Sequence, residues 1–413
     1  MIHRIFIFQL ILMWLPDLYI YYQVLKPRFS RFRWICWLHW LPSIVLTLSL
    51  SYLMFGDNFT SMRVKFTAAL MVAFLTFIVP KCLFVLVSLF GRFLNLISRF
   101  SLCKILTKFR INTMLDLLGC FVACFGAYII LYGSVWGWHR FEVKEIPFFH
   151  PDVPESFDGY RIVQISDFHI GTIASYPDVV HRAVEIINTQ HPDLIVFTGD
   201  LVNNEASELN GLENILSDLH AKDGVFSVLG NHDYGLYRRW PDKQAHANNL
   251  VDLKQRNLRM GWNLLLNANK IISRGKDSIA VVGVENDGKP PFPALGDLPR
   301  ALQGTDGMFK VLLSHDPSHW RRKVIPETDI QLMLAGHTHG MQFRLGDFSP
   351  SAWIYPEWGG LYTQGNQNLY VSVGLGSVMI PFRYGAWPEI SVITLRRKSY
   401  DESNNKDITV IKE

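Results

Sequence analysis

The sequence predicts an α/β domain that follows a polytopic membrane module. Long apolar stretches dominate the chain from Ile5 to about Trp138, whereas charged and apolar residues mix from about Phe141 onward. In the second part, short apolar runs that end in polar clusters alternate with helical patterns, as in α/β proteins. We therefore expect a membrane module over 1–140, a mixed α/β domain over 141–400 and a flexible tail over 401–413.

Four stretches of the first part have the length of a transmembrane helix, which needs about 20 apolar residues. A cleaved signal peptide would account for one such stretch at most, so the set predicts a module of four transmembrane helices. The predicted spans are residues 5–25, 34–55, 66–89 and 117–138.

Basic residues in the connecting loops predict the orientation, because cytoplasmic loops are rich in Lys and Arg. The second loop has only Arg63 and Lys65, beside Asp57. We therefore expect loops one and three in the cytoplasm, and the second domain on the outer face of an inner or plasma membrane, which is periplasmic in a Gram-negative bacterium. The basic residues of loops one and three are Lys26, Arg28, Arg31, Arg33, Arg92, Arg99, Lys104, Lys108 and Arg110.

Two charged residues interrupt the spans, Asp17 in the first and Lys81 in the third. Charges at such depth are paired, snorkelling or functional, so we expect a structural pair or a snorkelling lysine rather than a transport role. The aromatic runs "YIYYQ" and "WICWLHW" are typical of anchors at the membrane interface.

All cysteines fall in the membrane module, which excludes a disulfide framework and a cysteine-ligated zinc site from the second domain. They are Cys36, Cys82, Cys103, Cys120 and Cys124. The formal net charge of +4 comes with basic residues in the predicted cytoplasmic loops. We therefore expect membrane lipids as partners, and no nucleic acid.

The second domain contains apolar runs that are typical of strands buried on both faces, separated by helical stretches. Residues 177–190 and 206–220 have the apolar spacing of amphipathic helices, which gives a βαβαβ order. The predicted strands are "YRIVQIS", "LIVFTG", "VFSVLG", "KVLLS" and "IQLMLAG".

Polar side chains follow each of these runs. Ligands gather beyond the carboxyl ends of strands in such sheets, so the repetition of this pattern indicates a site. Taken singly, each residue has a structural interpretation, because Asp and Asn favour turns and a histidine at a strand end is often structural. The residues at the strand ends are Asp167, His169, Asp200, Asn231, His232, His315, His337 and His339.

Carboxylate, imidazole and amide groups without thiolate are ligands of divalent manganese, iron, zinc or cobalt. The set is too large for one tetrahedral ion. Two ions about 3.5–4 Å apart that share a carboxylate would use all of it and would suit phosphoester hydrolysis.

Five motifs in this order resemble the calcineurin-like metallophosphoesterase superfamily: "SDFHIG", "TGDLVNN", "LGNHDYG", "LLSHDP" and "LAGHTHG". The resemblance covers the chain from about Tyr160 to Leu395, and "SVGLGSVMIPFRYGAWPEI" is similar to the closing segment of the bacterial membrane-associated or exported branch. It implies a four-layer α/β sandwich with two β-sheets flanked by helices, and a metal-dependent phosphoesterase.

The resemblance also implies the roles of individual residues. Asp200 would bridge two metal ions, His232 would contact the phosphate or the leaving group, and Asp233 would orient His232. The chain departs from the related branch at Met341, where a second glycine is common, and we expect altered substrate fit there. The first metal would be held by Asp167, His169, Asp200 and His339, and the second by Asp200, Asn231, His315 and His337.

The expected activity is cleavage of a phosphodiester or pyrophosphate by in-line attack of a metal-bridging hydroxide. Aromatic segments at 348–362 and 379–390 point to a lipid-linked substrate, although such residues also pack long loops onto a sheet. Arg344 and Arg383 are candidates for phosphate contact or for a solvated surface. The alternative function is a metal-stabilised binding or sensor module, without turnover, attached to a membrane transport or signalling unit.

Overall fold

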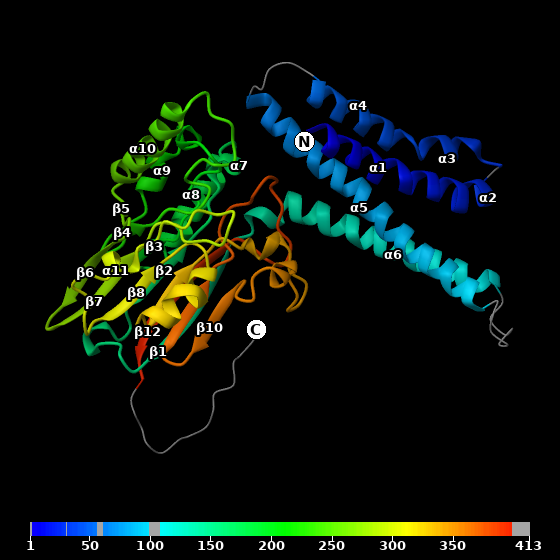
Figure 1. Ribbon diagram of the computed structural model, residues 1–413. Coiled ribbons are helices and arrows are strands. Elements are labelled where there is room, and N and C mark those ends of the chain that lie inside the picture. The colour runs from blue at the N-terminus through cyan, green and yellow to red at the C-terminus, as the bar shows by residue number, and fades with distance from the viewer. Residues whose placement is uncertain (1, 30, 56–60, 99–107, 399–413) are drawn as a thin grey trace. The chain divides into compact units, whose positions relative to one another are not determined.

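The computed structural model describes residues 2–29, 31–55, 61–98 and 108–398 (Figure 1). The chain forms two compact units, Met1–Val135 and Trp136–Glu413. Some residues used in the predictions lie outside the described residues, or have side chains that do. These are Asp57, Arg99, Cys103, Lys104 and the tail 401–413, and the side chains of Arg63, Lys65, Lys108 and Arg110.

The first unit is helical. Its helices are α1 (Ile2–Ile20), the π-helical turn η1 (Tyr21–Leu25), α2 (Lys26–Phe29), α3 (Arg33–Leu38), α4 (Leu41–Phe55), α5 (Ser61–Ser98) and α6 (Lys108–Val135). Three helices of the described residues are long and apolar enough to cross a membrane: Arg33–Tyr52, Phe66–Ile97 and Ile111–His139. They coincide with the second, third and fourth predicted spans, whereas the first predicted span falls on α1 and η1.

Apolar side chains lie on the outside of this unit. Leu15 and Leu86 are each 64% exposed and Phe121 is 69% exposed. A helix that is apolar on its outer face is stable in lipid rather than in water. The inner contacts of α1, α4 and α5 are also apolar, with Met13 and Phe74 in one buried cluster.

Two carboxylates are buried within the helical unit. The Lys81 ammonium lies 2.6 Å from Asp17 Oδ1, and the His39 ring lies 3.3 Å from the same oxygen. The predicted Asp17–Lys81 pair is therefore confirmed. Asp116 lies between two guanidinium groups, those of Arg28 at 2.8 Å and Arg92 at 3.2 Å.

The second unit contains two six-stranded sheets. The first sheet has the order β1 (Glu142–His150), β12 (Glu389–Arg397), β2 (Arg161–Ile165), β3 (Leu194–Phe197), β4 (Val225–Ser227) and β5 (Asn263–Leu264). The second has the order β10 (Gly360–Gln364), β11 (Gln367–Val371), β9 (Leu332–Ala335), β8 (Phe309–Leu313), β7 (Asp277–Gly283) and β6 (Ala268–Arg274). Every predicted strand is therefore confirmed.

Parallel pairing aligns the ends of the central strands. β2, β3, β4 and β5 are parallel, with Val163 opposite Ile195 and Val196 opposite Phe226. β7, β8, β9 and β11 are also parallel. β12 is antiparallel to β2 and parallel to β1, and the edge strands β6 and β10 are antiparallel to their neighbours. The carboxyl ends of the parallel strands therefore meet at one edge of each sheet, where ligands gather in such folds.

Helices and helical turns connect the strands, and several of them cover the outer faces of the sheets. The longer ones are α8 (Pro177–Asn188), α9 (Glu213–Ser217) and α10 (Lys243–Arg259), and the shorter ones are α7 (Ile170–Ile173), α11 (Leu298–Ala301), α12 (Ile325–Glu327), η2 (Gly137–His139), η3 (Glu155–Phe157), η4 (Ala206–Leu209), η5 (Trp320–Val324), η6 (His339–Gln342) and η7 (Pro350–Trp353). The predicted helix over 177–190 is confirmed. The one predicted over 206–220 is wrong in extent, because Gly211 at φ +80° separates η4 from α9.

Alternate side chains of the strands build three buried layers. Val163 of β2 packs with Val184 of α8 on the outer face of the first sheet. Ile162 of β2 packs in one cluster with Val311 of β8, so the two sheets face each other across an apolar layer. Leu312 of β8 packs with helical residues on the outer face of the second sheet. The fold is the predicted sandwich of two sheets between helices.

Candidate metal centre

The predicted ligands follow the carboxyl ends of five strands and converge on one place. Asp167 and His169 follow β2, Asp200 follows β3, and Asn231 follows β4. From the second sheet, His315 follows β8, and His337 and His339 follow β9. All of them are buried except His337, which is half-buried. Three groups that could hold a metal ion lie here: Asp167–His169–His339, His169–Asp200–His232 and Asp200–His315–His337.

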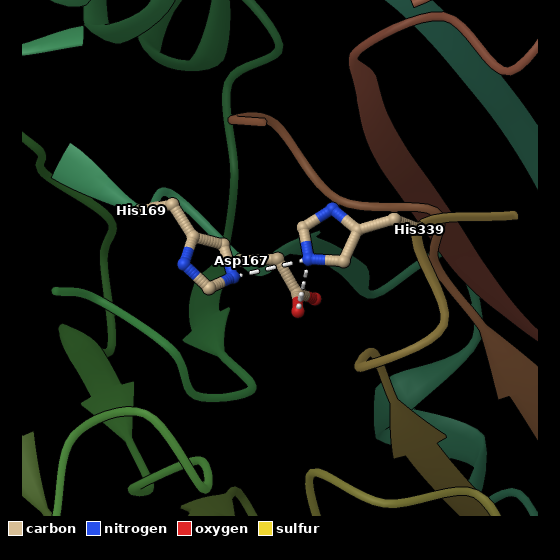
Figure 2. Close-up of side chains that lie close together, drawn as sticks. All are labelled: Asp167, His169 and His339. Carbon is tan, nitrogen blue, oxygen red and sulfur yellow. Dashed lines mark hydrogen bonds and ion pairs between the residues drawn. The ribbon is translucent and has the colours of Figure 1, made fainter. Parts of the chain in front are cut away.

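The first group joins the two sheets (Figure 2). His339 Nε2 lies 3.2 Å from Asp167 Oδ1 and 3.0 Å from His169 Nε2. Two imidazole nitrogens at this distance repel each other unless a proton or a cation lies between their lone pairs. The arrangement therefore fits a cation held by these three side chains.

A second group has the same character. His315 Nε2 lies 3.1 Å from Asp200 Oδ2, 3.2 Å from Asn231 Oδ1 and 3.2 Å from His337 Nδ1. Again two ring nitrogens and two oxygens point at one another. Nitrogen and oxygen donors without sulfur suit a divalent transition-metal ion.

Asp200 lies between the two groups. Its Oδ2 is 3.1 Å from His315 Nε2 and 3.5 Å from His169 Nε2. Its Oδ1 accepts a hydrogen bond from the His232 amide at 2.8 Å, which fixes the orientation of the carboxylate. One oxygen of Asp200 therefore faces imidazoles of both groups.

The backbone at these positions adopts a conformation that non-glycine residues rarely take. Such conformations cost about 1–3 kcal/mol each and cluster at functional sites. The ligands with positive φ are Asp167 (53°), His169 (45°), Asp200 (59°), His337 (74°) and His339 (51°).

The glycines beside the ligands allow close approach of the chain. A Cβ at Gly336 would collide with Ser166 Oγ and Asp167 Oδ2, and one at Gly230 would collide with Asp200 Oδ1. The neighbouring strand ends can therefore come together only because these positions lack a side chain.

The carboxylates of the centre favour a positive charge beside them. Burial alone would lower the pKa of His315, but the Asp200 and Asp167 carboxylates raise it to about 10. Burial and the nearby His339 lower the pKa of His169 to about 3. Carboxylates that stabilise a proton at this place also suit a divalent cation, so the residues present fit a metal centre.

The second ring nitrogens of two ligands are fixed by acceptors. His169 Nδ1 donates to Asn203 Oδ1 at 2.9 Å, and His315 Nδ1 donates to the Thr198 carbonyl at 2.7 Å. Because these acceptors hold the Nδ1 protons, Nε2 of each neutral ring is left unprotonated and faces the centre.

Tyrosine hydroxyls contact two further ligands, Asn231 and His337, through the side-chain nitrogens that point away from the centre. Asn231 Nδ2 donates to the Tyr237 hydroxyl at 2.8 Å, and His337 Nε2 lies 2.7 Å from the Tyr355 hydroxyl. Sequence reasoning missed both tyrosines. Tyr355 lies in the aromatic segment 348–362, and no motif links that segment to a ligand.

His232 lies at the edge of the centre. Its Nδ1 lies 2.9 Å from the Asn203 carbonyl oxygen. A carbonyl only accepts, so Nδ1 carries a proton and Nε2 is free in the neutral ring. Its ring is 4.7 Å from that of His169 and 4.4 Å from that of Tyr237, between centroids.

The prediction that Asp233 orients the His232 ring is wrong. The Asp233 carboxylate is fully buried and accepts backbone amides at 2.9–3.1 Å. Burial and the nearby Asp200 raise the pKa of Asp233 to about 7. Asp233 instead fixes the loops that carry the ligands, and its amide donors are those of Asp200, Leu201, Val202 and Gly230.

Two other residues differ from their simplest interpretation. Arg383 is fully buried rather than solvated, donates to the Gly376 carbonyl at 2.7 Å and lies 3.1 Å from His339 Nδ1. Met341 has a φ of 47° and is 42% exposed, which explains why glycine is favourable there.

Comparison with known proteins matches both units. Residues 160–341 match the family described as "Calcineurin-like phosphoesterase", and residues 3–138 match "Probable Calcineurin-like phosphoesterase, transmembrane domain". The chain is 32% identical over 270 residues to "Uncharacterized metallophosphoesterase YkuE" of Bacillus subtilis, covering 62% of this chain and 86% of that protein.

Two further similarities come from zebrafish. "Transmembrane protein with metallophosphoesterase domain" of Danio rerio is 29% identical over 281 residues, covering 66% of this chain and 61% of that protein. The chain thus spans less than two thirds of that relative. The structure of a dimetal phosphatase from Danio rerio has a TM-score of 0.33 and 14% identity, covering 55% of this chain and 94% of that one.

Proposed function

Because this chain belongs to the calcineurin-like phosphoesterase family and carries a transmembrane domain, we propose that it is a membrane-anchored phosphohydrolase with two divalent metal ions. The observation that carries the proposal is the position of Asp200 Oδ2, between His315 Nε2 at 3.1 Å and His169 Nε2 at 3.5 Å. A carboxylate in this position is suited to bridge two cations.

The ligands divide into two sets that share Asp200. Divalent ions bound there would lower the pKa of a water molecule and stabilise negative charge on phosphoryl oxygens. Manganese, iron, zinc or cobalt suits these donors. The proposed sets are Asp167, His169, Asp200 and His339 for one ion, and Asp200, Asn231, His315 and His337 for the other.

His232 is the proposed proton donor or phosphate contact. Its Nδ1 proton is held by the Asn203 carbonyl, so Nε2 is the atom available to the substrate. One of its ring nitrogens lies within 4.8 Å of a ring nitrogen of His169 and of a carboxylate oxygen of Asp200. Donation of a proton to the leaving oxygen is within reach of an imidazole so placed.

The proposed substrate is a phosphodiester or pyrophosphate linked to a lipid. Tyr355 contacts the ligand His337, and the adjacent side chains are apolar and exposed, with Trp353 at 78% and Ile354 at 58%. An exposed apolar surface that begins at the metal centre suits an acyl chain or a membrane surface.

We also propose that the catalytic domain lies on the outer face of the membrane, because loops one and three are basic and such loops stay in the cytoplasm. A reporter that folds only outside the cytoplasm, fused after Glu413, should be active. If instead a reporter that works only in the cytoplasm is active at this position, the domain lies on the cytoplasmic face and the proposed orientation is wrong.

The function is tested with the full-length protein in detergent, stripped of metal and then supplied with manganese, zinc or magnesium. Hydrolysis of bis(p-nitrophenyl) phosphate should depend on metal. His232→Ala should lower the rate about 10²–10⁴-fold with metal content unchanged. His220→Ala, at an exposed histidine outside the centre, is the matched control.

Each other outcome has a definite meaning. Turnover by metal-free protein, or full turnover in His232→Ala, contradicts the proposed chemistry. Metal bound at the centre without turnover of any diester or pyrophosphate would favour a binding or sensor module instead.

A further inference from the structure

A pocket of about 250 Å³ lies in the helical unit, where the end of the first helix meets α3. Its walls come from η1, α2, α3 and the turn before α4. The lining residues are Tyr21, Lys26, Arg33, Cys36, Trp37 and Trp40.

The pocket walls are aromatic and packed. The rings of Tyr21 and Trp40 are in contact, with centroids 5.4 Å apart, and Trp40 stacks on Trp14 at 5.8 Å. Tyr21 and Trp40 are half-buried, whereas Trp37 is 72% exposed at the rim. The pocket therefore has a fixed inner wall and an open aromatic edge.

The lining of the pocket carries two positive charges, those of Lys26 and Arg33. Lys26 and Arg33 are both exposed, and neither takes part in an ion pair with a carboxylate among the described residues. Asp17 is the one acidic residue among the first 56 of the sequence, and it is buried against Lys81. The neighbouring Arg28 is neutralised, because it lies 2.8 Å from Asp116.

The pocket lies at one end of a candidate membrane span. The candidate span Arg33–Tyr52 begins at Arg33, so this cation stands at the end of a membrane-crossing stretch. Exposed tryptophans follow at once, Trp34 at 62% and Trp37 at 72%. Aromatic side chains next to basic residues at a helix end mark the headgroup region of a bilayer.

We propose that this pocket binds the phosphate group of an anionic phospholipid. The two cations attract an anion whose headgroup carries no positive charge of its own. A zwitterionic lipid would bring an ammonium group close to Lys26 and Arg33. The aromatic edge at Trp37 packs against the apolar part that follows the headgroup. The proposal does not depend on the reaction at the metal centre.

The experiment uses the full-length protein in detergent mixed with equal amounts of phosphatidylglycerol and phosphatidylcholine. Native mass spectrometry counts the lipids that stay bound. Since a basic residue beside an anionic headgroup contributes about a fivefold preference, and Lys26 and Arg33 both line the pocket, Lys26→Gln with Arg33→Gln should reduce phosphatidylglycerol bound there about 30-fold. Arg31→Gln, in the same loop but outside the lining, should leave it unchanged.

Three results would overturn the proposal. These are equal retention of phosphatidylglycerol by the protein and its double variant, equal retention of both lipids by the unchanged protein, and displacement of the lipid by millimolar inorganic phosphate. The last would identify a site for free phosphate. Circular dichroism and hydrolysis of bis(p-nitrophenyl) phosphate, both unchanged in the double variant, confirm that the helices and the catalytic domain remain folded.

Discussion

The two units each bury a carboxylate, and they differ in what neutralises it. Asp17 of the helical unit is 0% exposed and Asp200 of the catalytic unit is 1% exposed. Asp17 lies 2.6 Å from the Lys81 ammonium. Among the described residues, the ion-pair partners of Asp200 are imidazoles, His315 at 3.1 Å and His169 at 3.5 Å.

This difference separates a structural carboxylate from a ligand. A buried charge is stable only when a partner of opposite sign is close. The helical unit supplies that partner from its own sequence, so the Asp17–Lys81 pair joins α1 and α5. The catalytic unit offers imidazoles, such as His315 with its raised pKa, whose charge is a proton that a metal ion can replace.

The largest expected effect is that of Asp200→Asn. An amide there keeps the size of the side chain but removes the charge shared by both ligand sets. We expect loss of bound metal and at least about a 1,000-fold loss of turnover. The metal ions would stabilise the negative charge that develops on the phosphoryl oxygens, and this stabilisation is lost with them. Metal content per chain by plasma mass spectrometry, and hydrolysis rates, measure both.

Asp17→Asn is the matched comparison, and it should retain metal and turnover. If Asp200→Asn still binds metal and is fully active, Asp200 is not a metal ligand, and it does not differ from the structural carboxylate Asp17 in the way proposed.

The next effect is on stability. Lys81→Met removes the ammonium and leaves the buried Asp17 with His39 and Ser43 as its polar neighbours. Removal of one partner of a buried pair costs about 3–5 kcal/mol of unfolding free energy. Denaturation followed by helical circular dichroism should show a destabilised helical unit with unchanged metal content. Asp17→Asn combined with Lys81→Met should recover much of the lost stability. A double variant no more stable than Lys81→Met would show that the loss does not come from the unpaired Asp17 carboxylate.

Much of the metal centre could be predicted because its ligands are local features of the sequence. Each follows a strand of the sheet by one to a few residues, as with Asp200 after β3 and His315 after β8. Parallel pairing then brings the strand ends together without further information. The Asp17–Lys81 pair could be predicted for a similar reason, because opposite charges within apolar spans are stable only when they are paired.

The residues that position the ligands could not be predicted from the sequence. Tyr355 reaches His337 from a loop 18 residues away in the chain, and His232 is held by a backbone carbonyl rather than by Asp233. A carboxylate beside a histidine in sequence suggests an orienting pair. Here the buried Asp233 turns instead to the amides of Asp200 and Gly230. Loop conformation, which the motifs do not encode, decided both cases.

A smaller effect is expected from Tyr355→Phe. The hydroxyl lies 2.7 Å from His337 Nε2 and so fixes the ring whose Nδ1 faces His315. Loss of such a partner lowers metal affinity about 10–100-fold, which titration of metal into the stripped protein measures. Tyr362→Phe is the control, because its hydroxyl lies 3.1 Å from the Gly359 carbonyl and away from the ligands. Equal loss in both variants would indicate general loosening of the loop.

The smallest effect comes from a third buried carboxylate, which tests the comparison within one unit. Glu389 is 1% exposed and, like Asp17, has its own cation, with Lys144 Nζ at 2.6 Å. Tyr370 and Ser391 donate to its other oxygen at 2.8 and 2.7 Å. If a resident ammonium marks a structural carboxylate, Glu389→Gln should lower stability without changing metal content.

The pH dependence of that variant gives the sharpest outcome. Burial alone would raise the pKa of Glu389, but Lys144, Ser391 and Tyr370 hold it below its ordinary value. A lowered carboxyl pKa means that its contribution is present above the unfolded pKa, near 4.3, and is lost as pH falls through the folded value. Glu389→Gln should therefore cost about 1.5 kcal/mol of unfolding free energy at pH 7, and this difference should shrink in acid. A constant difference from pH 7 down to pH 3, or loss of metal at pH 7, would show that a resident cation does not mark a structural carboxylate.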